Sequence, residues 1–199
     1  MRYKRITNNP RERENKIHSW CYWENVFSDD ELKSIIDMCS NFKLEKGKIR
    51  NQINDENIRK SNINFFYKNE NTSLIFNRFN YIIESINEEY FNFDLNGYEM
   101  IQYSEYDSKE LGEYKFHMDI DLDEISNGNR KISLTFLLND DFEGGEFQMN
   151  MDSSDIPITI PTEKNKAIIF PSFLIHRVAP VTRGVRKSLV IWVLGPKFR

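Results

Sequence analysis

His117 and Asp119 are separated by a single residue in a stretch, Tyr114–Asp119, that has the character of a β-strand. Side chains two apart on a strand point to the same face, so an imidazole and a carboxylate would lie side by side. The chain contains two other histidines, His18 and His176, and only His176 lies in another short apolar run of strand type. Two histidines and one carboxylate on one face of a metal form the facial triad of non-haem Fe(II) oxygenases. We therefore expect His117, Asp119 and His176 to bind a metal, and we give His18 no such role.

Arg186 follows His176 in a second strand-like segment, where it alternates with apolar residues and shares a face with Ser188. If that face lines the interior, the guanidinium needs an anionic partner, because a buried unpaired charge is costly. The planar fork of arginine matches a carboxylate in bidentate geometry, so a bound dicarboxylate is a candidate partner. If the face points outward, Arg186 is simply solvated, and periodicity alone does not decide between the two.

Composition limits the alternatives. The 199 residues are 39% hydrophobic and include 15 phenylalanines, which is enough to fill the core of one domain. The net charge of −4 argues against broad nucleic-acid binding, which needs a basic surface. The chain has two cysteines, no apolar run at its N-terminus and no stretch near the roughly 20 apolar residues of a membrane span. We therefore expect a cytoplasmic protein without a membrane partner.

Two helices are predicted before the strands. The first begins at Ser28, where Glu31 completes a capping box, and the second begins near Thr72. Their apolar faces consist of two sets of residues at helical spacing: Leu32, Ile35, Ile36 and Cys39, then Ile75, Phe79, Ile82, Ile83, Ile86 and Tyr90. Between the helices, the polar segment 44–60 is predicted to be a loop or mobile hairpin, which raises the hypothesis of a lid.

From Gly97 onward the hydrophobic pattern changes to that of short strands separated by turns. Eight are predicted: Tyr98–Tyr103, Tyr114–Asp119, Ile132–Leu138, Glu146–Met151, Ile156–Ile160, Ala167–Phe170, Leu174–Val178 and Lys187–Leu194. This pattern indicates a sandwich, barrel or jelly roll covered by helices on one sheet. We expect a single domain over residues 1–199, with a helical support region at 19–96 and a β core at 97–199.

Several motifs occur in this core in a fixed order. They are Glu113–Asp119, Leu138–Asp140, Glu143–Glu146, Phe170–Ser172, His176–Thr182, Gly184–Leu189 and Trp192. Their order and spacing resemble those of the 2-oxoglutarate- and Fe(II)-dependent oxygenases, specifically the prolyl 4-hydroxylase-like branch. The resemblance implies an all-β core with flanking helices, in which a double-stranded β-helix packs on N-terminal helices.

The resemblance also assigns roles to residues. It implies that His117, Asp119 and His176 bind Fe(II), and that Arg186, assisted by Ser188, binds the distal carboxylate of 2-oxoglutarate. It places a tyrosine that contacts this cosubstrate at Tyr103. Tyr106 is the alternative, because the segment from Ser108 to Gly112 looks inserted. Leu137 stands where many relatives have a second tyrosine.

The activity implied is hydroxylation of a prolyl or other residue of a protein or peptide. 2-Oxoglutarate and O₂ would be consumed, succinate and CO₂ would be formed, and ascorbate is left open as a further cofactor. Three alternatives remain: hydroxylation of a small molecule, demethylation of nucleic acids, and a jelly-roll protein that binds metal without turnover. The nucleic-acid branch usually has a second arginine where this chain has Trp192, and pure binding would not need Arg186. The oligomeric state is open.

Overall fold

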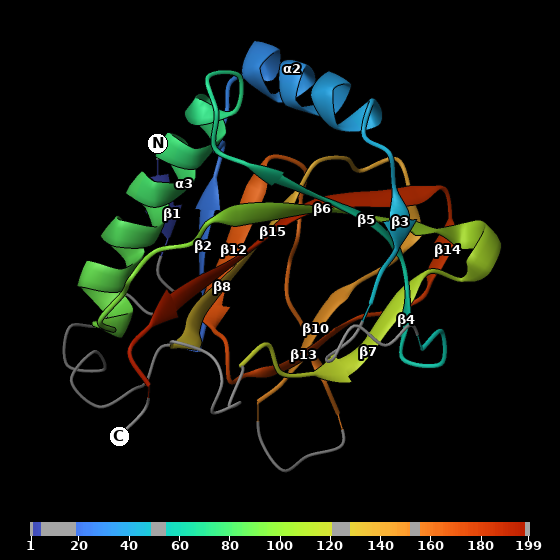
Figure 1. Ribbon diagram of the computed structural model, residues 1–199. Coiled ribbons are helices and arrows are strands. Elements are labelled where there is room, and N and C mark those ends of the chain that lie inside the picture. The colour runs from blue at the N-terminus through green and yellow to red at the C-terminus, as the bar shows by residue number, and fades with distance from the viewer. Residues whose placement is uncertain (1, 5–18, 49–54, 121–127, 152–155, 198–199) are drawn as a thin grey trace.

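The computed structural model describes residues 2–4, 19–48, 55–120, 128–151 and 156–197, which form two antiparallel sheets that face each other (Figure 1). The larger sheet runs in the order β1 (Arg2–Lys4), β2 (Cys21–Glu24), β12 (Lys166–Pro171), β8 (Asn129–Leu137), β15 (Val185–Gly195), β6 (Met100–Asp107), β5 (Asn62–Tyr67) and β3 (Glu45–Lys46). The smaller sheet runs in the order β11 (Ile158–Thr159), β10 (Phe147–Asn150), β13 (Ile175–Val178), β7 (Glu113–His117) and β4 (Arg59–Lys60). A short pair, β9 (Glu143–Gly144) and β14 (Val181–Arg183), lies beside them. This is the predicted double-stranded β-helix.

Both predicted helices are present, α2 (Asp29–Ser40) and α3 (Ser73–Ile86). The capping box of α2 is complete: the Ser28 hydroxyl accepts from the Glu31 N–H, and the Glu31 carboxylate accepts from the Ser28 N–H. The apolar face of α3 packs on the larger sheet, and the chain continues into a short π-helical turn, Asn87–Phe91. Neither helix has the length and apolar character required to cross a membrane, among the residues that the structure describes.

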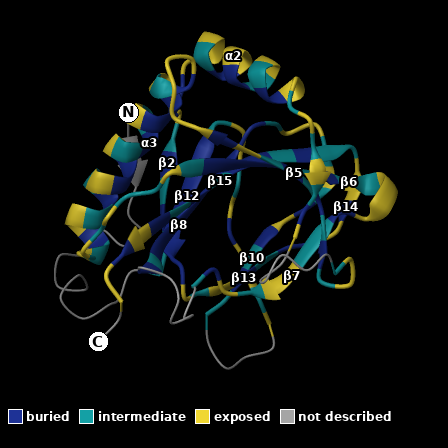
Figure 2. Ribbon diagram, viewed as in Figure 1, coloured by how far each residue is buried: buried dark blue, intermediate teal, exposed yellow. Residues whose placement is uncertain are grey.

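The larger sheet separates two apolar layers. On β15, Leu189, Ile191 and Val193 face the helices and belong to the larger core. The residues between them face the smaller sheet, where a second core gathers around Phe147 and Phe170. Figure 2 shows β8 and β12 buried over almost their whole length, whereas β15 alternates between buried and partly exposed residues.

All eight predicted strands are found, with altered ends. The largest change is in β6, which continues beyond Tyr103 to Asp107 because Glu105–Asp107 remain paired with Val185–Lys187. The region before Gly97 supplies strands as well as helices, since β2 pairs with β12 and β5 pairs with β6. The predicted loop at 44–60 contains β3 and β4, while 49–54 lie outside the described residues.

Phe79 on α3 is fully buried and joins the helix to the sheet through edge-to-face contacts with Phe27 and Phe136, at centroid distances of 5.6 and 5.5 Å. We predict that Phe79→Ala lowers the free energy of unfolding by about 3–5 kcal/mol, because a large aromatic ring is lost from a packed core. Chemical denaturation followed by fluorescence measures this value. Leu74→Ala on the exposed face of the same helix is the control, with an expected change within about 0.5 kcal/mol. Equal losses in the two variants would contradict the packing described here.

Candidate metal and cosubstrate site

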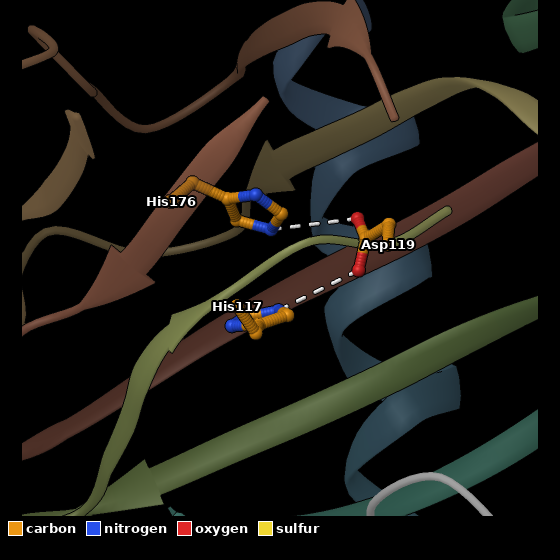
Figure 3. A group of neighbouring side chains, drawn as sticks. All are labelled: His117, Asp119 and His176. Atoms are coloured by element: carbon orange, nitrogen blue, oxygen red, sulfur yellow. Dashed lines mark ion pairs between the residues drawn. The ribbon is translucent and has the colours of Figure 1, made fainter. Parts of the chain in front are cut away.

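The pairing of β7 with β13 brings the two histidines together. His117 and His176 are directly opposed in the register of this antiparallel pair, and their ring centroids lie 4.3 Å apart. They are 59 residues apart in the sequence, so only the sheet makes them neighbours. The two imidazoles therefore reach the same point from adjacent strands (Figure 3).

Asp119 lies just beyond the end of β7, which stops at His117, two residues before the predicted end. The strand ends there because the N–H groups of Asp119 and Ile120 both donate to the Ser172 carbonyl. The side chains of His117 and Asp119 nevertheless share a face, and Met118 between them is exposed. The Asp119 carboxylate meets both imidazoles: Oδ1 is 3.5 Å from Nε2 of His117, and Oδ2 is 3.4 Å from Nε2 of His176.

Backbone carbonyls orient both imidazoles. Nδ1 of His117 lies 2.7 Å from the Lys115 carbonyl, and Nδ1 of His176 lies 2.9 Å from the Leu174 carbonyl. A carbonyl oxygen only accepts, so each Nδ1 carries the proton, and each Nε2 presents its lone pair to the space beside Asp119. This is the arrangement that a metal-binding histidine requires, with its second nitrogen held by an outer partner.

The electrostatics of the cluster keep Asp119 ionised. Burial alone would raise the pKa of Asp119, but the nearby His176 imidazole, together with the close approach of the His117 ring, holds it well below its usual range. Burial lowers the pKa of His117, which keeps that ring neutral, whereas Asp119 outweighs burial at His176 and raises its pKa. Among the described residues, these three form a group whose ligand atoms all lie within 4.8 Å of one another. Two nitrogen donors and one carboxylate fit a divalent transition metal.

A cavity of about 430 Å³, partly open to solvent, lies between the sheets and is lined by these three residues. Its other walls combine apolar and polar side chains: Phe147, Phe170, Val178, Val190, Thr135, Gln102, Trp192, Tyr106, Tyr114, Arg59, Arg186 and Ser188. The mixture of apolar walls with a few polar groups is typical of sites that bind small ligands.

Arg186 faces this cavity and not the solvent. The face of β15 that carries Arg186 and Ser188 therefore points to the interior. The Arg186 side chain is 1% exposed, and Nη1 donates to Ser188 Oγ at 3.0 Å. Nε is buried without a hydrogen-bond partner, and no ion pair is formed with any described carboxylate. Burial lowers the pKa of Arg186. The guanidinium is thus a buried cation whose hydrogen-bonding capacity is not filled by the protein, as expected where an anion binds.

The motif Glu143–Glu146 provides the space for this arginine. Gly145 has φ +65°, and a Cβ at that position would lie 2.9 Å from Cδ of Arg186. The Gly145 N–H donates to the Pro180 carbonyl, which fixes the turn against the arginine stem. A side chain at position 145 would therefore be strained and would displace Arg186.

The structure separates the two candidate tyrosines. Tyr103 faces the helices, where its ring packs near Phe42 and its hydroxyl donates to Glu105 Oε1 at 2.6 Å. Tyr106 points to the opposite face of β6, lines the cavity and lies opposite Arg186 in the strand register. The guanidinium lies 5.7 Å from the Tyr106 ring centroid. Tyr103, the expected cosubstrate tyrosine, therefore lies away from the cavity, and its alternative Tyr106 lines it, because β6 continues four residues beyond its predicted end.

Two cavity residues were missed in the sequence. Arg59 was read as part of a polar loop, but it pairs with Tyr114 across β4 and β7, and its guanidinium lies 4.8 Å from the Tyr114 ring centroid. Tyr114 in turn stacks on His117 at 3.5 Å. The result is a layered wall beside the histidine. The only sequence signal was the position of Arg59 just before a strand, which was too weak to find it.

The comparisons with known proteins agree with this geometry. Residues 101–194 match the family described as the 2OG-Fe(II) oxygenase superfamily. The match covers a little under half of the chain and takes in the strands that carry His117, His176 and Arg186. Members of the family use Fe(II), 2-oxoglutarate and O₂.

The chain is also similar to individual proteins of known sequence or structure. A PKHD-type hydroxylase of Synechococcus sp. is 34% identical over 84 residues, which are 41% of this chain and 36% of that protein. The chain thus matches about a third of the length of this curated relative. Among solved structures, a Trichoplax adhaerens prolyl hydroxylase in complex with a peptide fragment of hypoxia inducible factor has a TM-score of 0.75 at 15% identity, over 92% of this chain and 86% of that one. A Pseudomonas putida prolyl-4-hydroxylase has a TM-score of 0.71 at 17% identity, over 90% and 94%.

We predict that replacing His117, Asp119 or His176 by alanine weakens Co(II) binding by more than the roughly 10–100-fold typical for loss of an outer-shell partner. Each change removes one of the three donor atoms, and Co(II) is a redox-stable stand-in for Fe(II) with visible absorption. Titration of the metal-free protein followed by absorbance measures the affinity. His18→Ala is the control, although this residue lies outside the described residues. Wild-type affinity in any of the three variants would contradict the site.

Proposed function

We propose that this chain is a 2-oxoglutarate- and Fe(II)-dependent dioxygenase that hydroxylates a prolyl or other residue of a peptide. The observation that carries the proposal is Arg186, which is buried and forms no ion pair with any described carboxylate. It lines the same cavity as the two histidines and Asp119. A metal site alone would not need this cation. A dicarboxylate that reaches from the metal to Arg186 would use both.

His117, Asp119 and His176 hold Fe(II), and the carbonyls behind each Nδ1 keep the imidazoles directed toward it. When bound, the iron supplies the oxidation: 2-oxoglutarate and O₂ give succinate and CO₂, and one oxygen atom is inserted into a C–H bond of the substrate. Arg186 binds the distal carboxylate of 2-oxoglutarate through its planar fork.

Ser188 and Tyr106 support this cosubstrate position. Ser188 accepts from Nη1 of Arg186 and so fixes the plane of the guanidinium. The Tyr106 ring flanks the same group, with its hydroxyl available on the cavity side of β6. Leu137, opposite Ser188 on β8, offers no hydroxyl, which fits the expected loss of a second tyrosine contact. Phe147 and Phe170 keep the wall beside the histidines apolar and limit access of water.

A peptide substrate is supported by the prolyl hydroxylases among the structural neighbours, one of which is described in complex with a peptide fragment. The cytoplasm is the proposed location, supported by the small number of cysteines in the chain, Cys21 and Cys39. Both are buried, and burial raises the pKa of the Cys39 thiol to about 12, so it is not a reactive nucleophile. A role for ascorbate remains part of the proposal without a residue assigned to it.

We predict that wild-type protein with Fe(II) and O₂ converts 2-oxoglutarate to succinate, and that Arg186→Ala raises the KM for 2-oxoglutarate about 10–100-fold. The reason is the loss of charge-assisted hydrogen bonds, worth about 1.5–3 kcal/mol. Succinate formation is followed by mass spectrometry. Arg183→Ala removes an exposed arginine paired with Glu143 and serves as the control, with the KM unchanged.

The tyrosines provide a matched pair for the same assay. Tyr106→Phe should raise the KM for 2-oxoglutarate several-fold, because a hydroxyl is removed from the cavity. Tyr103→Phe should leave it unchanged, because that hydroxyl is engaged with Glu105 on the far face of the strand. The reverse order of effects would restore Tyr103 as the cosubstrate tyrosine. Absence of succinate from the wild type, with metal bound, would leave the metal-binding jelly roll as the function.

We predict that a library of proline-containing peptides includes substrates that gain one oxygen atom, about 16 Da, only when 2-oxoglutarate and Fe(II) are present. Tandem mass spectrometry identifies the modified residue. His176→Ala protein is the control, since it lacks a metal ligand but keeps the remainder of the cavity. Turnover stimulated by free amino acids or other small molecules, and not by any peptide, would assign the chain to the small-molecule hydroxylases instead.

A further inference from the structure

Besides the two histidines, the Asp119 carboxylate contacts a serine. Ser133 on β8 donates from Oγ to Asp119 Oδ2 at 2.7 Å, and Ser133 Oγ lies 2.9 Å from Ser172 Oγ. Both hydroxyls are fully buried. An ionised carboxylate only accepts, so the single proton of Ser133 is directed to Asp119, and Ser172 must donate to Ser133. The hydroxyls form a chain with one direction, Ser172 to Ser133 to Asp119.

The neighbours of Ser133 in the sheet offer its hydroxyl no other hydrogen-bond partner among their side chains. On β8 it lies between Phe170 of β12 and Trp192 of β15 in the sheet register. Its surroundings are therefore largely aromatic, and a buried hydroxyl without a partner costs free energy. An alanine would pack in this place without that cost. The serine is explained by the carboxylate that it contacts.

Ser172 connects this chain to a second ligand. Its carbonyl accepts from the N–H groups of Asp119 and Ile120, and it lies in the turn closed by the Leu174 N–H and the Pro171 carbonyl. The carbonyl of Leu174 in the same turn accepts from Nδ1 of His176. One turn, Pro171–Leu174, thus orients the backbone of Asp119 and the imidazole of His176.

We infer that Ser133 and Ser172 are positioning residues for the metal site, which act by fixing the plane and the charge distribution of the Asp119 carboxylate. The inference rests on the proposed function only in that a metal binds to these three ligands. With Oδ2 held by Ser133, the carboxylate cannot rotate freely, and the order of the site is set before the metal arrives. Hydroxyls in a chain also polarise one another, so Ser172 strengthens the bond that Ser133 makes.

The test is Co(II) titration of metal-free protein, with affinity and the visible absorption spectrum as readouts. Ser133→Ala should weaken Co(II) binding about 10–100-fold and alter the spectrum, as found for loss of outer-shell partners. Ser133→Thr keeps Oγ and should restore both readouts to near wild-type values. Ser104→Ala is the matched control: Ser104 is a buried serine of β6 whose hydroxyl accepts from Gln102, and its loss should leave Co(II) affinity unchanged.

Additivity distinguishes a chain from two independent effects. Ser172→Ala should weaken Co(II) binding less than Ser133→Ala, and the double variant should be no weaker than Ser133→Ala alone, because Ser172 acts through Ser133. Thermal unfolding without metal is measured for each variant. The inference is overturned if Ser133→Ala binds Co(II) with wild-type affinity, or if Ser133→Thr is as weak as Ser133→Ala while both are folded. No binding by the wild type would instead overturn the metal site itself.

Discussion

The antiparallel pairing of β7 with β13 is the constraint on which the site depends. It places His117 opposite His176, and its register has no freedom to change, because a shift of one residue would turn each histidine to the other face of the sheet. The pairing is fixed from outside as well, since β10 holds β13 on its other edge and β4 holds β7. The opposition of the two histidines is therefore a property of the whole smaller sheet.

The larger sheet uses alternation to serve two purposes at once. Along β15, Leu189 and Ile191 pack in the core beneath the helices. Arg186 and Ser188 point the other way, into the cavity between the two sheets. If the polar face of β15 were its only covered face, few apolar contacts would hold the strand in the sheet. The helices supply the missing apolar contact on the opposite side. In this way α3, which contributes no residue to the cavity lining described here, helps to hold the cavity wall that carries Arg186 and Ser188.

Sequence patterns predicted the helices, the eight core strands and the residues that the cavity unites from β7, β13 and β15. These predictions succeeded because hydrophobic periodicity and helix-capping residues are local features that can be recognised in the sequence itself. The assignment of Tyr103 came from the resemblance, which does not specify how far the pairing of β6 extends; in the structure Tyr103 faces the helices, and Tyr106, three residues further along β6, lines the cavity. Arg59 was missed for a related reason, since its place depends on the pairing of β4 with β7 across the fold. The carbonyl partners of the imidazoles have no side-chain signature at all.

Asp119 and Arg186, two buried ions of the cavity, differ in how far the protein compensates their charges. Asp119 is surrounded by two imidazoles and a serine hydroxyl, so its charge is stabilised within the fold. Arg186 receives one hydroxyl and an aromatic face, and its Nε receives nothing. A buried charge left in this state costs stability, and that cost is recovered only when an anion binds. A ligand that bears a metal-binding group at one end and a carboxylate at the other compensates both ends in one step. The uneven compensation is thus itself a basis for selectivity: a monocarboxylate would leave either the metal or Arg186 without a partner.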